Sequence, residues 1–261
     1  MNLGHRESTP RGHVIVMHGA DALRVIDPVE YHAAYMSRGV RPDGRALLRG
    51  RKPVAHSLPL SSVEGSSMMC IGHTTVLVGV RCETVAPLDS EPCCGRVVIN
   101  MELPPICSPV VAAAHSGGGA GGAQRIDREK AVAVELLQRT ANGGLINLEA
   151  LCAAEGVAVW HCHCDIYVIE HDGNIIDVCM LAMMVALGRI RLPKVAVDEA
   201  SGALTVIEEE AVRICLAAPL YACSFGVLSG RLLLDPNAAE EAVISTTFTV
   251  GGLMHACALP T

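Results

Sequence analysis

The stretch VAVWHCHCDIYVIE at residues 157–170, with HDGN at 171–174 and the run VCMLAMMVALGR at 178–189, decides the fold of this chain. The first segment is rich in β-branched and aromatic residues, which predicts one long strand or hairpin arm. The Asp-Gly pair that follows it predicts a turn. The third segment is almost entirely apolar, which predicts a helix that is the most buried element of the domain.

The same unit, strands followed by a helix, is expected earlier in the chain. Alternating or β-branched segments predict four successive strands in an antiparallel sheet of hairpins, at 53–60, 66–71, 74–83 and 96–103. A Gly/Ala-rich segment at 112–123 predicts a mobile loop, and an amphipathic helix is expected at 126–139. In the C-terminal part, Pro193 is expected to stop an element. Strands are expected at 195–207, 222–228, 231–235 and 246–251, and a helix is expected at 237–245. Strand-rich halves that each carry a helix indicate an α+β domain.

Composition limits the classes of function. The chain has 261 residues, 51% of them hydrophobic, which is enough for one large domain and excludes general disorder. The net charge of -7 argues against a nucleic-acid binder that works alone through a basic surface, and 3% aromatic residues argue against a base-stacking platform. The 12 cysteines lie in apolar runs, which is typical of buried thiols in a reducing compartment. We expect no membrane segment and no signal peptide.

Two features precede the first expected strand. Residues 1–37 predict a polar tail and a short helix near 27–36, capped by Asp27, so we expect one domain at 38–261. Residues 37–52 hold six Lys or Arg residues against one Asp, the only strongly basic stretch of the chain. Such a charge run is either a solvated loop or a contact for RNA or a partner protein, and the sequence leaves both open.

The motif WHCHCD at residues 160–165 holds Cys and His at spacings found among zinc ligands. In an extended strand, however, Cys162 and Cys164 point to one face and His161 and His163 to the other. No second pair of ligands with the usual spacing lies nearby, so we expect no metal. A metal-binding regulator that uses these cysteines and histidines remains the weaker alternative.

Several motifs, in this order along the chain, resemble the RNase PH family. RPDGR at 41–45, EGSS at 64–67 and GHTTVLVGV at 72–80 are similar to the opening of RNase PH domains. NMELPPICS at 100–108, CD at 164–165 and DGNIID at 172–177 are similar to ring subunits of the eukaryotic RNA exosome. The resemblance runs from about residue 38 to 261. It implies an RNase PH-like α+β domain of two βαβα-type halves, like ribosomal protein S5 domain 2, with an N-terminal extension.

The resemblance also implies a test for catalytic activity. Active members hold phosphate with arginines and a Gly-Thr-Arg turn, while carboxylates hold a metal ion or assist proton transfer. Ile175 and Ile176 stand where the Thr-Arg falls, and aliphatic side chains donate no hydrogen bond to phosphate. Asp235 and Glu241 resemble the acidic pair, as a vestige, with Thr247 where a third acid would stand.

These departures predict a non-catalytic subunit with no cofactor and no metal. By the resemblance, it would join other RNase PH-like exosome subunits in a six-membered ring, support S1/KH-type cap subunits and guide RNA through the central channel. RNA processing and degradation, including rRNA maturation, would then take place in the nucleus, nucleolus and cytoplasm. Arg41, Arg45 and Arg125 are expected to contact RNA. The alternative is an active phosphate-dependent 3′-to-5′ exoribonuclease with a rearranged phosphate site.

Overall fold

The computed structural model of the protein describes residues 19–57, 59–116, 119–197, 204–217 and 220–253. The chain forms two compact units, residues 1–47 and 48–261. The first unit contains the helices α1 (Gly19–Ile26) and α2 (Pro28–Ser37). The predicted cap is confirmed, because Oδ1 of Asp27 accepts a hydrogen bond from the backbone N–H of Glu30 at 3.0 Å and Pro28 opens the first turn.

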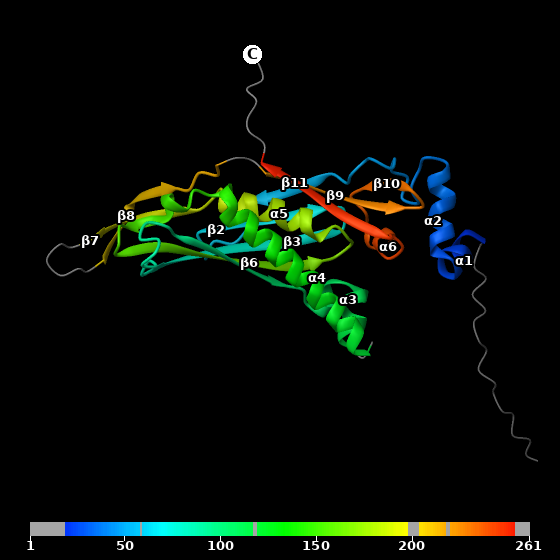
Figure 1. Ribbon diagram of the computed structural model, residues 1–261, viewed down its shortest axis with the longest axis horizontal. Helices are drawn as coiled ribbons and strands as arrows, with labels where there is room; N and C mark the ends of the chain where they lie inside the picture. The colour runs from blue at the N-terminus through cyan, green and yellow to red at the C-terminus, as the bar shows by residue number, and fades with distance from the viewer. Residues whose placement is uncertain (1–18, 58, 117–118, 198–203, 218–219, 254–261) are drawn as a thin grey trace, which may run out of the picture. The chain divides into compact units, whose positions relative to one another are not determined.

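A six-stranded sheet is the largest element of the second unit (Figure 1). Its order is β1-β2-β3-β6-β4, with the short strand β5 paired to β6. The strands are β1 (Pro53–Ser57), β2 (Gly65–Ile71), β3 (Thr74–Val85), β4 (Arg96–Glu102), β5 (Cys152–Ala154) and β6 (Ala158–Glu170). All described neighbours are antiparallel except β4 and β6, which are parallel. The expected antiparallel succession is confirmed for β1, β2 and β3, but it is wrong for β4, because the apolar strand β6 lies between β3 and β4.

Strand β6 alternates between the core and the surface, as its sequence predicts. Cys162, Cys164, Ile166 and Val168 are each at most 1% exposed, whereas the residues between them reach the other face of the sheet. This alternation separates the cysteines of the WHCHCD motif from its histidines.

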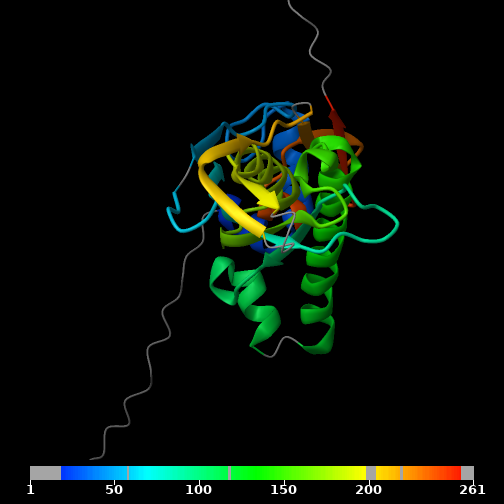
Figure 2. The ribbon, with the colours of Figure 1, turned by 90° about the vertical axis from the view of Figure 1, so that its left-hand side faces the viewer.

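Helices cover the buried face of the sheet. α5 (Ile175–Leu187) contacts β2 and β3 on one side and β9 on the other, and nine of its thirteen residues are buried, which confirms the predicted core helix. α4 (Gly119–Thr140) packs against β4, and α3 (Pro109–His115) lies beside α4, as the two neighbouring green helices of Figure 2 show. In the described part of 112–123 the expected loop is wrong, because alanine favours helix and Ser108 caps α3.

Shorter elements connect these helices and strands. The 3₁₀ turns are Pro105–Cys107 and Leu148–Leu151, and α4 is followed by a wide turn at Ala141–Leu145. In this turn Gly144 has a φ of 114°, a conformation that favours glycine. None of the helices in the described ranges is both long and apolar enough to cross a membrane.

The C-terminal part forms two small antiparallel sheets. One pairs β7 (Arg191–Val197) with β8 (Leu204–Arg213), and the other has the order β10-β9-β11, made of β9 (Leu220–Leu228), β10 (Arg231–Leu234) and β11 (Thr246–Leu253). The single strand expected at 195–207 is thus wrong. Pro193 lies inside β7, at a shift of register that accommodates a residue without an N–H. The last helix is only one turn, α6 (Ala238–Glu241), because the chain soon turns so that Ser245 bonds to Val227 of β9.

Candidate functional site

The turn between β6 and α5 organises the candidate site. Thr74 fixes this turn, since its hydroxyl donates to the carbonyl of Gly173 at 2.7 Å and accepts from the backbone N–H of Asp172 at 3.0 Å. Gly173 has a φ of 79°, and a Cβ there would come within 2.6 Å of the backbone nitrogen of Ala238. The next residue, Asn174, is left-handed and starts α5. The close contact at Gly173 therefore brings α6 against the beginning of α5.

Asp235 is held in place by Arg51. Its Oδ2 accepts from the backbone N–H and from Nε of Arg51 at 2.7 and 2.9 Å, and its Oδ1 accepts from Nη2 of Arg51 at 2.8 Å. Asn174 completes the set, since its Nδ2 donates to Oδ1 at 2.6 Å. Burial by itself raises the pKa of the Asp235 carboxyl, but the hydrogen bonds and charge of Arg51 outweigh it and hold the pKa below its usual value.

Arg51 is itself a hub of this region. Its guanidinium also donates from Nη1 to the carbonyl of Asp172 at 2.8 Å, and its side chain is only 10% exposed. The solvated-loop interpretation of the basic stretch is therefore wrong for Arg51. The residue ties the segment before β1 to the turn after β6 and to the end of β10.

A second carboxylate, Asp177 on α5, lies in the same network. Its Oδ1 accepts from the hydroxyl of Ser224 at 2.8 Å, and its Oδ2 accepts from the backbone N–H of Ser224 at 2.8 Å and from Nδ2 of Asn174 at 2.9 Å. The hydroxyl of Ser224 lies 2.8 Å from that of Thr249 on β11. Burial raises the pKa of Asp177, although these hydrogen bonds oppose the shift. The carboxylate links α5 to the β9–β11 sheet.

The third acid, Glu241 at the end of α6, reaches the first turn of α5. Its Oε1 accepts from the backbone N–H of Asn174 at 2.7 Å. Burial raises the pKa of Glu241 to about 7, against the opposing effects of this hydrogen bond and of His171. Nearby, Nε2 of His171 lies 3.7 Å from a carboxylate oxygen of Glu129 on α4. Glu241 thus places a carboxyl group at a helix N-terminus, the position that attracts anions.

A cavity of about 450 Å³ opens among these elements. Its walls come from α3, α4, the first turn of α5, α6 and the strands β9 and β11. Five residues that the sequence singled out line it, Arg125, Ile175, Ile176, Glu241 and Thr247. These positions, scattered along the sequence, therefore meet in one place. Charged and polar groups that it did not predict line the cavity as well: Arg128, Glu129, His171, Asn174, Ser224 and Thr249.

The other two predicted RNA contacts lie in the first unit. Arg41 is 1% exposed, and its Nη2 donates to the carbonyl of Leu47 at 2.7 Å. Arg45 donates from Nε to the carboxylate of Asp43 at 2.6 Å. Of the three predicted arginines, Arg125 is the one with an exposed side chain at the cavity. A role of these arginines in RNA binding stays a prediction.

The donor set does not fit a catalytic metal ion at the acidic pair. A metal ligand needs lone pairs directed at the ion, but the two carboxylate oxygens of Asp235 already accept four hydrogen bonds from Arg51 and Asn174. Glu241 is held at the N–H of Asn174. The side chains of Ile175 and Ile176 offer the cavity only hydrocarbon, as predicted. These contacts hold the fold together.

Sequence reasoning missed Arg51, Asn174 and Ser224, which hold the carboxylates. The signal for Asn174 lay in the DGN turn, since asparagine tolerates the left-handed conformation that ends such a turn. Arg51 was noticed only as one charge in a basic stretch. Its partner lies 184 residues further along the chain, and neither spacing nor periodicity reports a contact of that range.

Comparisons with known proteins agree with this arrangement. Residues 51–193 match the RNase PH family, described as 3′ exoribonuclease family, domain 1. "Exosome complex component rrp43" of Schizosaccharomyces pombe is 28% identical over 228 residues, which are 87% of this chain and 81% of the relative. "Exosome complex component Rrp42" of Methanosarcina mazei is 30% identical over 225 residues, 85% of this chain and 76% of the relative. A solved Archaeoglobus fulgidus exosome with RNA bound to the active site shares the fold, with a TM-score of 0.70 at 24% identity over 89% of this chain and 82% of that one.

Proposed function

Because the chain belongs to the RNase PH family of 3′ exoribonucleases, we propose that it is a non-catalytic subunit of an RNA exosome ring, of the kind called ribosomal RNA-processing protein 43. Its role in this proposal is to assemble with other RNase PH-like subunits and to support 3′-to-5′ RNA processing and degradation, including rRNA maturation. It carries cap subunits with S1 and KH domains, lends RNA contacts to a shared channel, and works in the nucleus, nucleolus and cytoplasm.

One observation carries the non-catalytic part of the proposal: the carboxylate of Asp235 is bonded to Arg51 and Asn174 instead of facing the cavity with open lone pairs. A carboxylate that assists proton transfer or holds a metal must be able to exchange its partner during the reaction. Breaking the buried Arg51–Asp235 pair to do so would leave an uncompensated charge.

The charge around the cavity supports the same conclusion. Phosphorolysis needs cationic or N–H donors where negative charge develops on phosphate. Here the backbone N–H of Asn174, at the start of α5, is occupied by Glu241, and a second carboxylate, Glu129, lines the same cavity. An ionised Glu241 repels an incoming phosphate. Arg125 and Arg128 contribute cations, but Ile175 and Ile176 contribute no donor from their side chains.

The net charge of -7 fits a subunit that shares its RNA path with partners, because counterion release requires many cations along the nucleic acid. Apolar side chains remain exposed on the second unit, including Ile106, Tyr167, Phe248 and Val250. Such residues are suited to the core of a protein interface. Assembly therefore supplies both the missing basic surface and cover for these side chains.

The experiment that tests this proposal compares RNA degradation with assembly. The full-length chain, alone and with its co-purified partners, is incubated with 3′-tailed RNA in the presence and absence of phosphate. We expect to recover a stoichiometric complex that survives stringent salt. We also expect that this chain contributes no phosphate-dependent release of nucleoside diphosphates. Diphosphate release that Asp235→Asn abolishes, in a complex that size-exclusion chromatography shows to be intact, would identify the chain as the active phosphorolytic alternative.

A further inference from the structure

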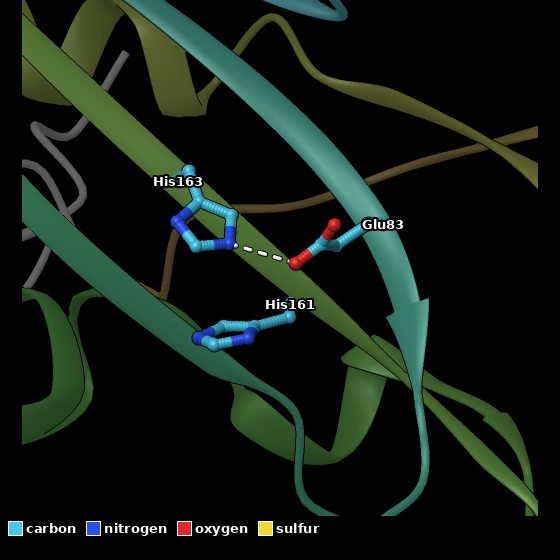
Figure 3. A group of neighbouring side chains, drawn as sticks. All are labelled: Glu83, His161 and His163. Atoms are coloured by element: carbon cyan, nitrogen blue, oxygen red, sulfur yellow. Dashed lines mark hydrogen bonds and ion pairs between the residues drawn. The ribbon is translucent and has the colours of Figure 1, made fainter.

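The solvent-facing side of strands β3 and β6 carries a cluster of potential metal ligands (Figure 3). Glu83 comes from β3, and His161 and His163 come from β6. Glu83 lies directly opposite His161 in the ladder, and His163 is the next residue of β6 on the same face. One ligand atom from each residue lies within 4.8 Å of the other two, and this is the one such three-residue group found among the described residues.

Two contacts show how closely these side chains approach. Nε2 of His163 lies 2.9 Å from Oε1 of Glu83, the dashed line of Figure 3, and the ring centroids of the two histidines are 4.6 Å apart. Around a tetrahedral Zn²⁺ with bonds of about 2.0–2.1 Å, ligand atoms are spaced by roughly 3.3 Å. The pair between Glu83 and His163 needs to open slightly, and no other pair of ligand atoms needs to close by more than about 1.5 Å. Rotation of half-exposed side chains supplies both changes.

A ring nitrogen of His161 also favours a metal site. Its Nε2 is buried and has no hydrogen-bond partner among the described residues, which is costly for a polar ring nitrogen. Burial, followed by the neighbouring His163, lowers the pKa of the His161 imidazole. A neutral imidazole has the free lone pair that binds transition metals.

The neighbouring arginine of β3 pairs with a different carboxylate and does not compete with the histidines for Glu83. Arg81, the next β3 residue on the same face, is paired with Asp165 at 2.9 Å. Asp165 also accepts from Asn100 at 3.0 Å. The opposing charge is Arg96 on β4, which lies beside His161 in the ladder and whose positive charge also lowers the pKa of that histidine. Arg96 therefore limits the affinity of the cluster for a cation and offers a way to test it.

We propose that Glu83, His161 and His163 bind one divalent transition-metal ion of the zinc class. Two imidazoles and a carboxylate form a set that suits zinc or its neighbours better than Ca²⁺ or Mg²⁺, which prefer oxygen alone. The fourth position is left to water or to a group from a partner. The ion clamps β3 to β6. Cys162 and Cys164 take no part, because both are buried on the opposite face of the sheet.

Titration of the full-length chain with Co²⁺ tests the site, because tetrahedral cobalt absorbs visible light and the spectrum distinguishes nitrogen and oxygen ligands from thiolate. Equilibrium dialysis against Zn²⁺ with elemental analysis gives the stoichiometry. We expect one equivalent without thiolate absorption. His163→Ala and Glu83→Gln should each weaken binding by at least about 10-fold. Arg96→Gln should strengthen it.

The matched control is His73→Ala. His73 also faces a carboxylate, that of Glu170 at 4.0 Å, but belongs to no group of three in the described chain. This variant should bind cobalt like the wild type, and circular dichroism checks that each variant is folded. The proposal is overturned if the wild-type chain binds no cobalt, if its spectrum is that of thiolate ligands, or if folded His163→Ala and Glu83→Gln bind with unchanged affinity.

Discussion

The buried ion pair of Arg51 and Asp235 allows a quantitative test of the candidate site. The side chains of Arg51 and Asp235 are 10% and 7% exposed, so the substitution Arg51→Met leaves a buried carboxylate without its cation. Loss of one member of such a pair costs about 3–5 kcal/mol. We expect this loss in the free energy of unfolding at pH 7.5, measured in urea by the fluorescence of Trp160, the only tryptophan.

The pH dependence of this loss follows from the pKa of Asp235. In the wild type Arg51 holds that pKa below its usual value, so the pair stabilises the fold above about pH 4, the pKa of an unfolded aspartate, and the contribution is lost as the pH falls through the lowered value. In Arg51→Met, burial without the cation raises the pKa, and protonation removes the unpaired charge. The deficit of the variant should therefore be smaller at pH 5 than at pH 7.5.

Two controls separate this effect from the general loss of an arginine. Arg81→Met removes an arginine that is 66% exposed and paired with Asp165, and an exposed pair is worth at most about 1 kcal/mol. Adding Asp235→Asn to Arg51→Met should recover part of the deficit, since asparagine tolerates the φ of 54° at this position and carries no charge. If Arg51→Met lowered the free energy of unfolding no more than Arg81→Met does, the conclusion that the Arg51–Asp235 pair stabilises the fold would be refuted.

Two further predictions concern the same site. Because burial raises the pKa of Glu241 to about 7, this group stabilises the fold below about pH 4.3, the pKa of an unfolded glutamate, and loses that contribution as the pH rises through 7. Glu241→Gln should therefore gain more than about 1 kcal/mol relative to the wild type between pH 5 and pH 8 in urea unfolding, and a constant difference would contradict the shift. Gly173→Ala introduces a Cβ within 2.6 Å of the backbone of Ala238 at a φ of 79°. We expect it to lower the free energy of unfolding by more than about 1 kcal/mol, whereas Gly230→Ala, with a φ of 73° but open space, should cost less.

The sequence predicted well where a local pattern has one physical cause. The alternation in residues 157–170 predicted a strand or hairpin arm with its cysteines on one face and its histidines on the other, and the apolar run after the turn predicted a core helix. The prediction from sequence failed where one composition is compatible with more than one secondary structure. The described part of the Gly/Ala segment that was expected to be a loop belongs to α3 and α4 instead, because alanine favours helix and Ser108 caps α3.

The residues of the candidate site also fall into those that the sequence could indicate and those that it could not. The resemblance singled out Ile175, Ile176 and Glu241, which line one cavity. A shared fold places positions that are distant in sequence next to one another. It did not reveal what holds Asp235, since Arg51 contacts it over a separation of 184 residues. The parallel pairing of β4 with β6 was missed for a related reason. Strand periodicity identifies which face of a strand is buried, but it does not identify the neighbouring strand.

The geometry also shows what a phosphorolytic site in this cavity would require beyond two substitutions. Replacing Ile175 and Ile176 by threonine and arginine would add donors to the cavity, but Asp235 would still be bonded to Arg51. A phosphate at the start of α5 would also have to displace or protonate Glu241, whose carboxyl accepts from the N–H of Asn174. The cavity itself is maintained because three of its walls, α4, α5 and β9, also contribute residues to the hydrophobic core. Under the proposed function, the absence of catalysis and the presence of the pocket therefore have separate causes, one in charge pairing and the other in packing.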